Sequence, residues 1–142
     1  MKPGLLLALL LCWSLPSLAT TGNSGRVVFD YQMNCQGCHT PDGSGAGSVP
    51  RMKGHVGIFL QSQEGREYLV RVPGSATSAL NDERLAAVLN WILTEFSGDS
   101  MNSPFKAFSA EEVGRLRQSP LKEVEQYRLK VLRDLSSMSM NE

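Results

Sequence analysis

Two cysteines and a histidine lie within five consecutive residues, Cys35, Cys38 and His39, in the segment "CQGCH". The chain contains only one further cysteine, Cys12, and one further histidine, His55. Thiols and imidazoles are the side chains that form covalent cross-links, exchange with disulfides and bind metal ions. Their concentration at one point of the chain marks this segment as the candidate site.

Four chemistries can use such a cluster. A disulfide between Cys35 and Cys38 closes too short a loop to stabilise the fold much. A thioredoxin-like redox pair requires a preceding strand in a βαβ unit, and the surrounding sequence is helical. A zinc site could recruit His39 and His55 as well, although adjacent Cys38 and His39 reach one ion only with difficulty. Covalent attachment of haem matches the spacing CxxCH and is favoured, while the disulfide and zinc sites stay open as alternatives.

The spacing has a physical reason. Residues three apart lie on one face at the end of a helix, so both thiols can add to the two vinyl groups along one edge of a porphyrin. The histidine that follows can then bind the iron. We therefore expect Cys35 and Cys38 to attach one haem c covalently, and His39 to be the proximal ligand of its iron.

The amino terminus has the pattern of a secretory signal peptide. Lys2 precedes an apolar run from Leu5 to Trp13, and small residues follow up to Ala19. The run is shorter than the roughly 20 residues that a helix needs to span a bilayer. We therefore predict a signal peptide over residues 1–19 and a soluble product exported to the periplasm.

Charge restricts the classes of partner. The 142 residues carry 14 basic and 14 acidic side chains, and the two signs are interspersed along the chain. A nucleic-acid-binding protein would show a basic stripe, and a protein attracted to anionic membranes would segregate its charges. The length corresponds to one domain, large enough to enclose a cofactor.

Hydrophobic periodicity predicts helices and no β-alternation, so we expect an all-α fold. The strongest pattern begins at Asn81, a capping residue, and carries one apolar face to Phe96. A loop rich in glycine and serine, residues 40–49, follows the motif and is expected to be flexible. The helices are expected over about residues 26–34, 65–72, 81–96, 109–118 and 121–135.

The motif and its surroundings resemble the small monohaem c-type cytochromes of the mitochondrial-like class. The family's first helix ends in CxxCHT, here "YQMNCQGCHT" with Tyr31 as the packing aromatic, and a proline that follows supplies a carbonyl to the haem histidine, here Pro50 in "VPRMKG". "NDERLAAVLNWIL" resembles the family's last helix, with Trp91 at its aromatic position. The resemblance implies a cytochrome c domain over residues 20–98 wrapped around the haem, and leaves residues 99–142 as a helical extension packed on it.

One departure concerns the second ligand of the iron. The resemblance places a methionine in the loop before the last family helix, and here that loop, "PGSATSALND", contains neither methionine nor histidine. Met101, in the loop after that helix, is the favoured substitute. Met52 and His55 are further candidates, and the position could also be open.

The resemblance implies a one-electron carrier, and not an enzyme, that works between a periplasmic dehydrogenase or reductase and an oxidase or another cytochrome. An open iron would instead suit a gas sensor or a peroxidase-like enzyme. Arg66 or Arg71 is considered as the partner of a haem propionate, although a solvated charge is the favoured interpretation of both.

Overall fold

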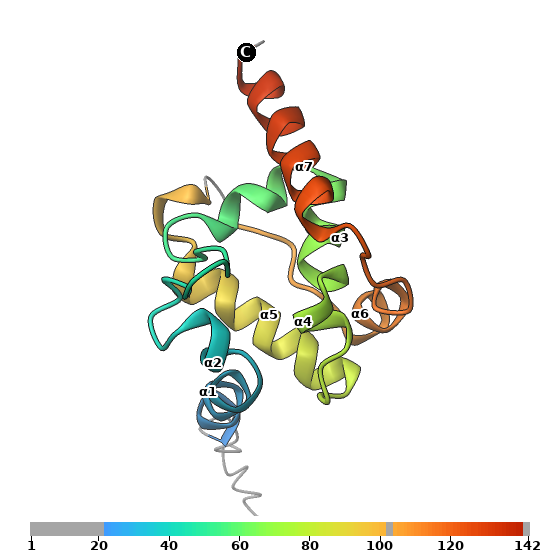
Figure 1. Cartoon of the computed structure of the whole chain (residues 1–142). Coiled ribbons are helices and arrows are strands. Elements are labelled where there is room, and N and C mark those ends of the chain that lie inside the picture. Colours follow the sequence, from blue (N-terminus) through green and yellow to red (C-terminus); the bar gives the residue numbers. More distant parts are fainter. Residues whose placement is uncertain (1–21, 102–103, 141–142) are drawn as a thin grey trace, which may run out of the picture.

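Helices are the regular elements of residues 22–101 and 104–140, the parts of the chain that the structure, a computed structural model, describes (Figure 1). No strand occurs within these residues, and the prediction of an all-α fold is confirmed. The predicted signal peptide, residues 1–19, lies outside them. In the described residues, none of the helices combines the length and the apolar character needed to cross a membrane.

The elements follow one another in the order α1 (Gly22–Asn34), α2 (Gln36–His39), η1 (Val56–Gln61), α3 (Gln63–Arg71), α4 (Pro73–Ala76), α5 (Asp82–Phe96), η2 (Gly98–Ser100), α6 (Ala110–Leu116) and α7 (Val124–Ser139), where η denotes a 3-10 helix. The last helix begins three residues later than its sequence pattern predicts. The reason is that the backbone N–H of Leu121 donates to the carbonyl of Arg71, 2.9 Å away, which ties this residue to α3 instead.

Helices α1 and α5 cross through three aromatic rings. The Tyr31 ring, 1% exposed, lies 4.9 Å from the Trp91 ring and 5.5 Å from the Phe96 ring, measured between centroids. The tilted arrangement of these rings is a favourable packing geometry for aromatic pairs. The expectation that Tyr31 and Trp91 join the first and last helices of the resembling region is confirmed.

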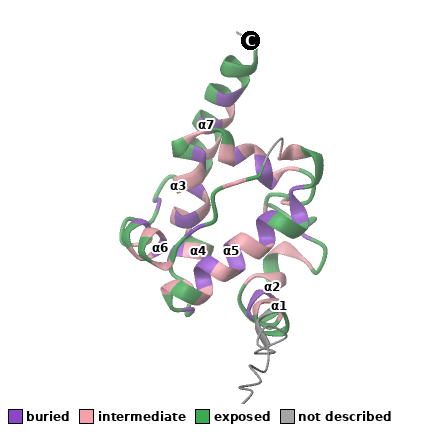
Figure 2. Ribbon diagram, turned by 180° about the vertical axis from the view of Figure 1, so that it is seen from behind, coloured by how far each residue is buried: buried purple, intermediate pink, exposed green. Residues whose placement is uncertain are grey.

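Helix α5 starts and packs as its sequence predicts. The Asn81 side-chain oxygen accepts from the Arg84 backbone N–H at 2.9 Å, which caps the helix. Its apolar face lies in the core, and Figure 2 shows it as a largely buried stripe through the middle of the molecule. The buried residues of the helix are Leu85, Ala86, Val88, Leu89, Ile92, Leu93 and Phe96.

A buried ion pair also holds α1 to α5. Asp30 is 2% exposed, and its carboxylate accepts from two nitrogens of the Arg84 guanidinium, one of them at 2.9 Å. The Arg26 guanidinium adds a longer contact of 3.5 Å. These charge-assisted hydrogen bonds, with Arg84 as the main cause, lower the pKa of Asp30 against the opposing effect of burial.

Helix α6 is linked to α5 and α3 through polar contacts. The Asn90 amide exchanges two hydrogen bonds with the backbone of Phe108, at 2.8 and 3.0 Å. The Arg66 guanidinium binds both oxygens of the Glu112 carboxylate, at 2.7 and 2.8 Å. The Ser109 hydroxyl caps the helix by accepting from the Glu112 N–H, as the sequence predicts.

The sequence interpretation of two arginines is wrong. Arg66 and Arg71 are expected from the sequence to be propionate partners or solvated charges, but their side chains are only 12% and 24% exposed. Arg66 is used by Glu112, and Arg71 lies beside Glu67 and donates to the Ser119 carbonyl at 2.8 Å. Both therefore join α3 to neighbouring segments.

We predict that Asp30→Asn destabilises the fold at neutral pH by about 2 kcal/mol, because the charge-assisted bonds to Arg84 are lost. Since folding lowers the pKa of Asp30, its contribution is present above the unfolded value of about 4 and is lost as the pH falls through the lower folded value. The difference between variant and wild type in denaturant unfolding should therefore be smaller at pH 3 than at pH 7.

Asp134→Asn provides the matched control. Asp134 also pairs with a basic residue, Lys130, but both side chains are more than half exposed. Its loss should change the free energy of unfolding little at either pH. Equal effects of the two substitutions at pH 7 would contradict the role given to the buried pair.

Candidate functional site

The CxxCH segment forms a single helical turn between α1 and the loop that follows. The Cys35 N–H donates to the Tyr31 carbonyl at 2.8 Å, which continues the hydrogen bonding of α1. The N–H groups of Cys38 and His39 then both donate to the Cys35 carbonyl, at 3.2 and 3.0 Å. The sequence predicted that the first helix delivers Cys35 at its end, and the structure adds the short helix α2 directly after it.

Both cysteines are free thiols. Cys35 is partly buried against the core, whereas Cys38 is exposed. Burial, with smaller effects of Asp30 and Cys38, raises the pKa of the Cys35 thiol to about 11, so it is protonated at neutral pH. A redox-active or zinc-binding cysteine is activated by a lowered pKa, and Cys35 shows the opposite.

The alternatives to haem attachment find no support in this arrangement. The two sulfurs are not joined in a disulfide. Within the residues that the structure describes, no three side chains of the His, Cys, Asp and Glu types are grouped so that they could hold a metal ion. His55, the fourth ligand of the zinc alternative, instead lies beside Arg128, with 3.4 Å between its Nε2 and Nη2 of the arginine.

His39 is held as a neutral imidazole. Burial lowers its pKa, and the backbone carbonyl of Pro50, which faces the ring, opposes the shift only in part. Its Nδ1 is buried and makes no hydrogen bond of normal geometry. A metal-binding histidine must be neutral and is usually oriented by a carbonyl on its far nitrogen. His39 and Pro50 therefore fit the roles expected for an iron ligand and its orienting carbonyl.

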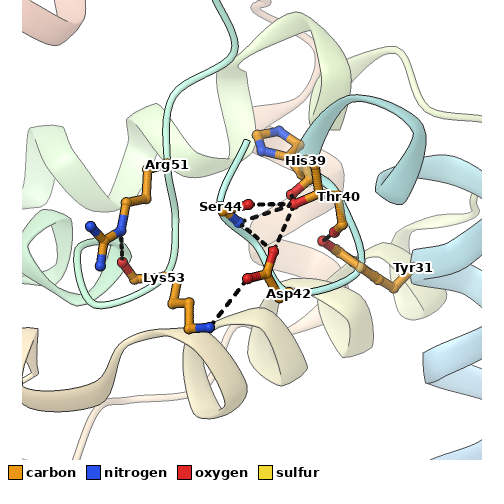
Figure 3. Close-up of polar contacts among 7 residues, drawn as sticks. All are labelled: Tyr31, His39, Thr40, Asp42, Ser44, Arg51 and Lys53. Atoms are coloured by element: carbon orange, nitrogen blue, oxygen red, sulfur yellow. Dashed lines mark hydrogen bonds and ion pairs between the residues drawn. The ribbon is translucent and has the colours of Figure 1, made fainter. Parts of the chain in front are cut away.

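The loop after the motif is tied down by a polar network, shown in Figure 3. The Asp42 carboxylate accepts from the Thr40 hydroxyl at 2.9 Å, from the Ser44 N–H at 3.2 Å and from Lys53 at 3.2 Å. These contacts lower the pKa of Asp42, Ser44 and Thr40 having the largest effects. The Tyr31 hydroxyl donates to the Thr40 carbonyl at 2.6 Å and joins the network to the aromatic cluster. The expectation of a flexible loop is wrong at its start, because local hydrogen bonds fix it.

The chain then returns toward His39 along a path set by backbone contacts. The N–H groups of Met52 and Lys53 both donate to the Gly43 carbonyl, at 2.8 and 3.0 Å. The Gly45 N–H donates to the His39 carbonyl at 3.2 Å. Figure 3 shows the His39 ring pointing away from Asp42 and the polar network. The polar side of the loop thus supports the backbone, and the imidazole is left to face Pro50.

The candidate sixth ligands lie close to one segment, η1 and the residues just before it. Met52 is partly buried against the core, and the His55 ring meets the Phe59 ring edge-on, with centroids 6.1 Å apart. Met101 packs on Gly57, where an added Cβ would lie only 2.8 Å from the Met101 Cβ. The Ser100 hydroxyl, 3.0 Å from the Gly57 N–H, holds that contact.

This placement bears on the favoured substitute. The resemblance puts the segment of Met52 and His55 on the same side of the haem as His39, and Met101 lies against its continuation in η1. The expected movement of the Met101 loop over the opposite face is therefore not what the structure shows. Between α3 and α5, where the family has its methionine, residues 72–81 contain no methionine or histidine.

The sequence analysis missed Arg128. This residue of α7 lies at the junction of α7, η1 and α3, with its guanidinium carbon 5.8 Å from the centre of the Phe59 ring. In the sequence it is one of several charges on an amphipathic helix, so its type and position give no signal. Only the packing of α7 on distant segments brings it to His55.

Comparison with known proteins assigns the same region to one family. A family model named Cytochrome c matches residues 23–95. Cytochrome c-552 of Thermus thermophilus is 38% identical over 106 residues, which cover 61% of this chain and 81% of the relative. A second cytochrome c-552, from another record of the same species, is also 38% identical over 106 residues, covering 72% of its length.

We predict that Gly45→Ala weakens the loop that brings Pro50 to His39. Gly45 has φ +76°, and an added Cβ would lie 2.5 Å from the Val49 carbonyl oxygen, a backbone atom that cannot turn away. The strained backbone and the clash should together lower the free energy of unfolding by about 1–3 kcal/mol. Chemical denaturation of the purified protein measures this.

Gly47→Ala separates the two causes. Gly47 also has a positive φ, +59°, but nothing lies within 4 Å of an added Cβ. It should therefore show only the smaller cost of the backbone conformation. If both substitutions destabilise the protein equally, the contact with Val49 does not constrain the loop.

Proposed function

The chain belongs to the cytochrome c family, and we propose that it carries single electrons through one haem c attached to Cys35 and Cys38, with His39 as the proximal ligand. Membership of the family implies covalently bound haem c and a role in electron transfer. The assignment of these three residues is supported by the geometry of the motif. One helical turn presents two free thiols, and the next residue is a neutral imidazole that faces a backbone carbonyl.

His39 is the observation that carries the proposal. A buried histidine whose Nδ1 has no partner of normal geometry is costly unless the ring has another use. Ligation of iron is such a use, because it requires the neutral ring that burial favours. Pro50 then orients the ring, and the hydrogen bonds of Gly43 to Met52 and Lys53 hold Pro50 in place.

The residues around the motif suit electron transfer. When bound, haem c supplies an iron that alternates between the ferric and ferrous states. The chain contributes a frame that need not rearrange between these states, since buried aromatic contacts and ion pairs join α1, α5 and α3. In this role the protein makes and breaks no bonds during turnover, and its surface meets partners in small, transient encounters.

The place of the carrier and the division of its chain are part of the proposal. The signal-peptide pattern of residues 1–19 supports export to the periplasm, with a dehydrogenase or reductase as donor and an oxidase or another cytochrome as acceptor. The cytochrome domain spans residues 20–98, and residues 99–142 form an extension packed on it. The bonds of Phe108 to Asn90 and of Glu112 to Arg66 support this packing.

A second function follows if the iron has no sixth protein ligand. Residues 72–81 contain no methionine or histidine, and Met52, His55 and Met101 all lie at or beside η1. An open position would let the protein bind a small ligand, as a gas sensor or a peroxidase-like enzyme does. Electron transfer remains the main proposal because it needs only the features that the family shares.

We predict that the double variant Cys35→Ala/Cys38→Ala yields no covalent haem. The two thiols are the proposed attachment points, and His39 alone cannot form a bond that survives denaturation. Haem staining after denaturing electrophoresis, together with intact-mass analysis of the exported protein, measures attachment. Met33→Ala is the control, because this neighbouring side chain is 67% exposed and should leave attachment unchanged. Normal staining of the double variant would refute the site.

A further prediction concerns Met101. Because Met101 packs on Gly57 of η1, Met101→Ala should leave the optical spectra of both redox states unchanged. Loss of a sulfur-to-iron charge-transfer band in the ferric variant would instead identify Met101 as the sixth ligand. Carbon monoxide added to the reduced wild type then separates the two functions. Rapid binding indicates an open iron, and an unchanged spectrum indicates a strong sixth ligand and a carrier alone.

A further inference from the structure

Arg128 is partly buried without an acidic partner. Its Nε atom is buried and has no hydrogen-bond partner, and one face of the guanidinium lies over the Phe59 ring. Its contact with His55 is long, 3.4 Å from Nη2 to Nε2. Among the ion pairs formed by residues 22–101 and 104–140, none includes Arg128.

The other inward-facing arginines differ from Arg128 in this respect. Arg66 binds Glu112, Arg84 binds Asp30, and Arg117 binds Asp82. A positive charge that is removed from water is costly unless an anion or several acceptors face it. Each of these other arginines has a carboxylate, so the position of Arg128 indicates an anion that the described residues do not supply.

The neighbours of Arg128 add positive charge and donors. A guanidinium can only donate, so Nε2 of His55 must be the acceptor, and the imidazole is neutral. Burial first, then Arg128 and Arg51, lower the pKa of His55 and favour the same state. The Tyr68 hydroxyl faces Arg128 as well; burial raises its pKa, and the arginine opposes that shift. The cluster thus presents two hydrogen-bond donors, an arginine and a phenol, and no acidic group.

We propose that Arg128 and Tyr68, supported by His55, bind a carboxylate of haem c, namely one of its propionates. This inference rests on the proposed function. The guanidinium fork matches a carboxylate in shape and charge. The cluster is also connected to the motif, because the Pro50 carbonyl faces His39 while the next residue, Arg51, acts on His55.

The proposal gives the extension a part in the cofactor site. Arg128 lies in α7, outside residues 23–95, which the family model matches. Figure 1 shows the first turns of α7 against η1 and α3, the elements that carry Phe59 and Tyr68. Arg66 and Arg71, the arginines that the sequence offered for a propionate, are occupied by Glu112 and by Glu67 with the Ser119 carbonyl.

The test compares the holoprotein with its Arg128→Gln variant at neutral pH. Loss of a positive charge beside the haem disfavours the reduced state, so the ratio of reduced to oxidised protein at a fixed electrode potential should fall by about threefold or more. Arg133→Gln is the matched control, because it removes the same charge from an exposed position of the same helix. An equal effect of the two substitutions would overturn the proposal.

Two conservative variants guard against misfolding and test the hydrogen bonds. Arg128→Lys keeps the charge but loses the fork, so it should recover most of the reduced fraction. Tyr68→Phe keeps the ring and removes only the hydroxyl. Both should shift the propionate carboxylate bands in redox-induced infrared difference spectra, and Arg133→Gln should not. Unchanged bands in both variants would overturn the assignment to haem.

A free anion is the other source of a carboxylate-like group, and it is distinguished by changing the buffer. If a propionate occupies the site, the effect of Arg128→Gln is the same in phosphate and in a non-coordinating buffer of equal ionic strength. An effect seen only in phosphate would overturn the proposal. Failure here leaves the proposed function intact as long as the wild type stains for covalent haem, whereas a wild type without haem removes both.

Discussion

The position of the CxxCH turn depends on the crossing of α1 and α5, where the Tyr31 ring packs against Trp91 and Phe96. Tyr31 acts on the site through three groups. Its ring fixes the helix crossing, its carbonyl accepts from the Cys35 N–H, and its hydroxyl donates to the Thr40 carbonyl. Burial is the main cause that raises the pKa of this hydroxyl to about 12, so it stays a donor at any physiological pH.

Phe96 carries the same constraint to the far side of the loop. Its carbonyl accepts from the Gly54 N–H, and an added Cβ on Gly43 would lie 2.9 Å from its ring. Gly43 in turn receives hydrogen bonds from Met52 and Lys53, on either side of which the chain passes Pro50 and His55. One aromatic crossing therefore positions both the turn that holds the thiols and the segment that faces His39.

The sequence predicted the parts of this arrangement that local chemistry determines. Helix α5 has a capping asparagine and a continuous apolar face, and the CxxCH spacing allows few chemistries, so both were accessible from residue types alone. Contacts between distant segments were not. Asp42 reads as a loop residue until Lys53 returns to it, and Arg66 reads as a solvated charge until α6 brings Glu112 beside it. Arg128 was missed for the same reason, since only the folded chain places α7 on η1.

The C-terminal extension also limits how the segment opposite these contacts can move. The Arg117 guanidinium donates to the carbonyls of Ala76, Ser78 and Leu80 and binds the Asp82 carboxylate. Residues 76–80, in the loop where the resemblance expects the second iron ligand, can shift only by breaking these bonds. A carrier benefits from such a restraint, because a site that keeps one arrangement in both oxidation states needs little reorganisation when an electron arrives. The same restraint keeps the loop from recruiting a new ligand, so whatever coordination the resting protein has is the one in which it works.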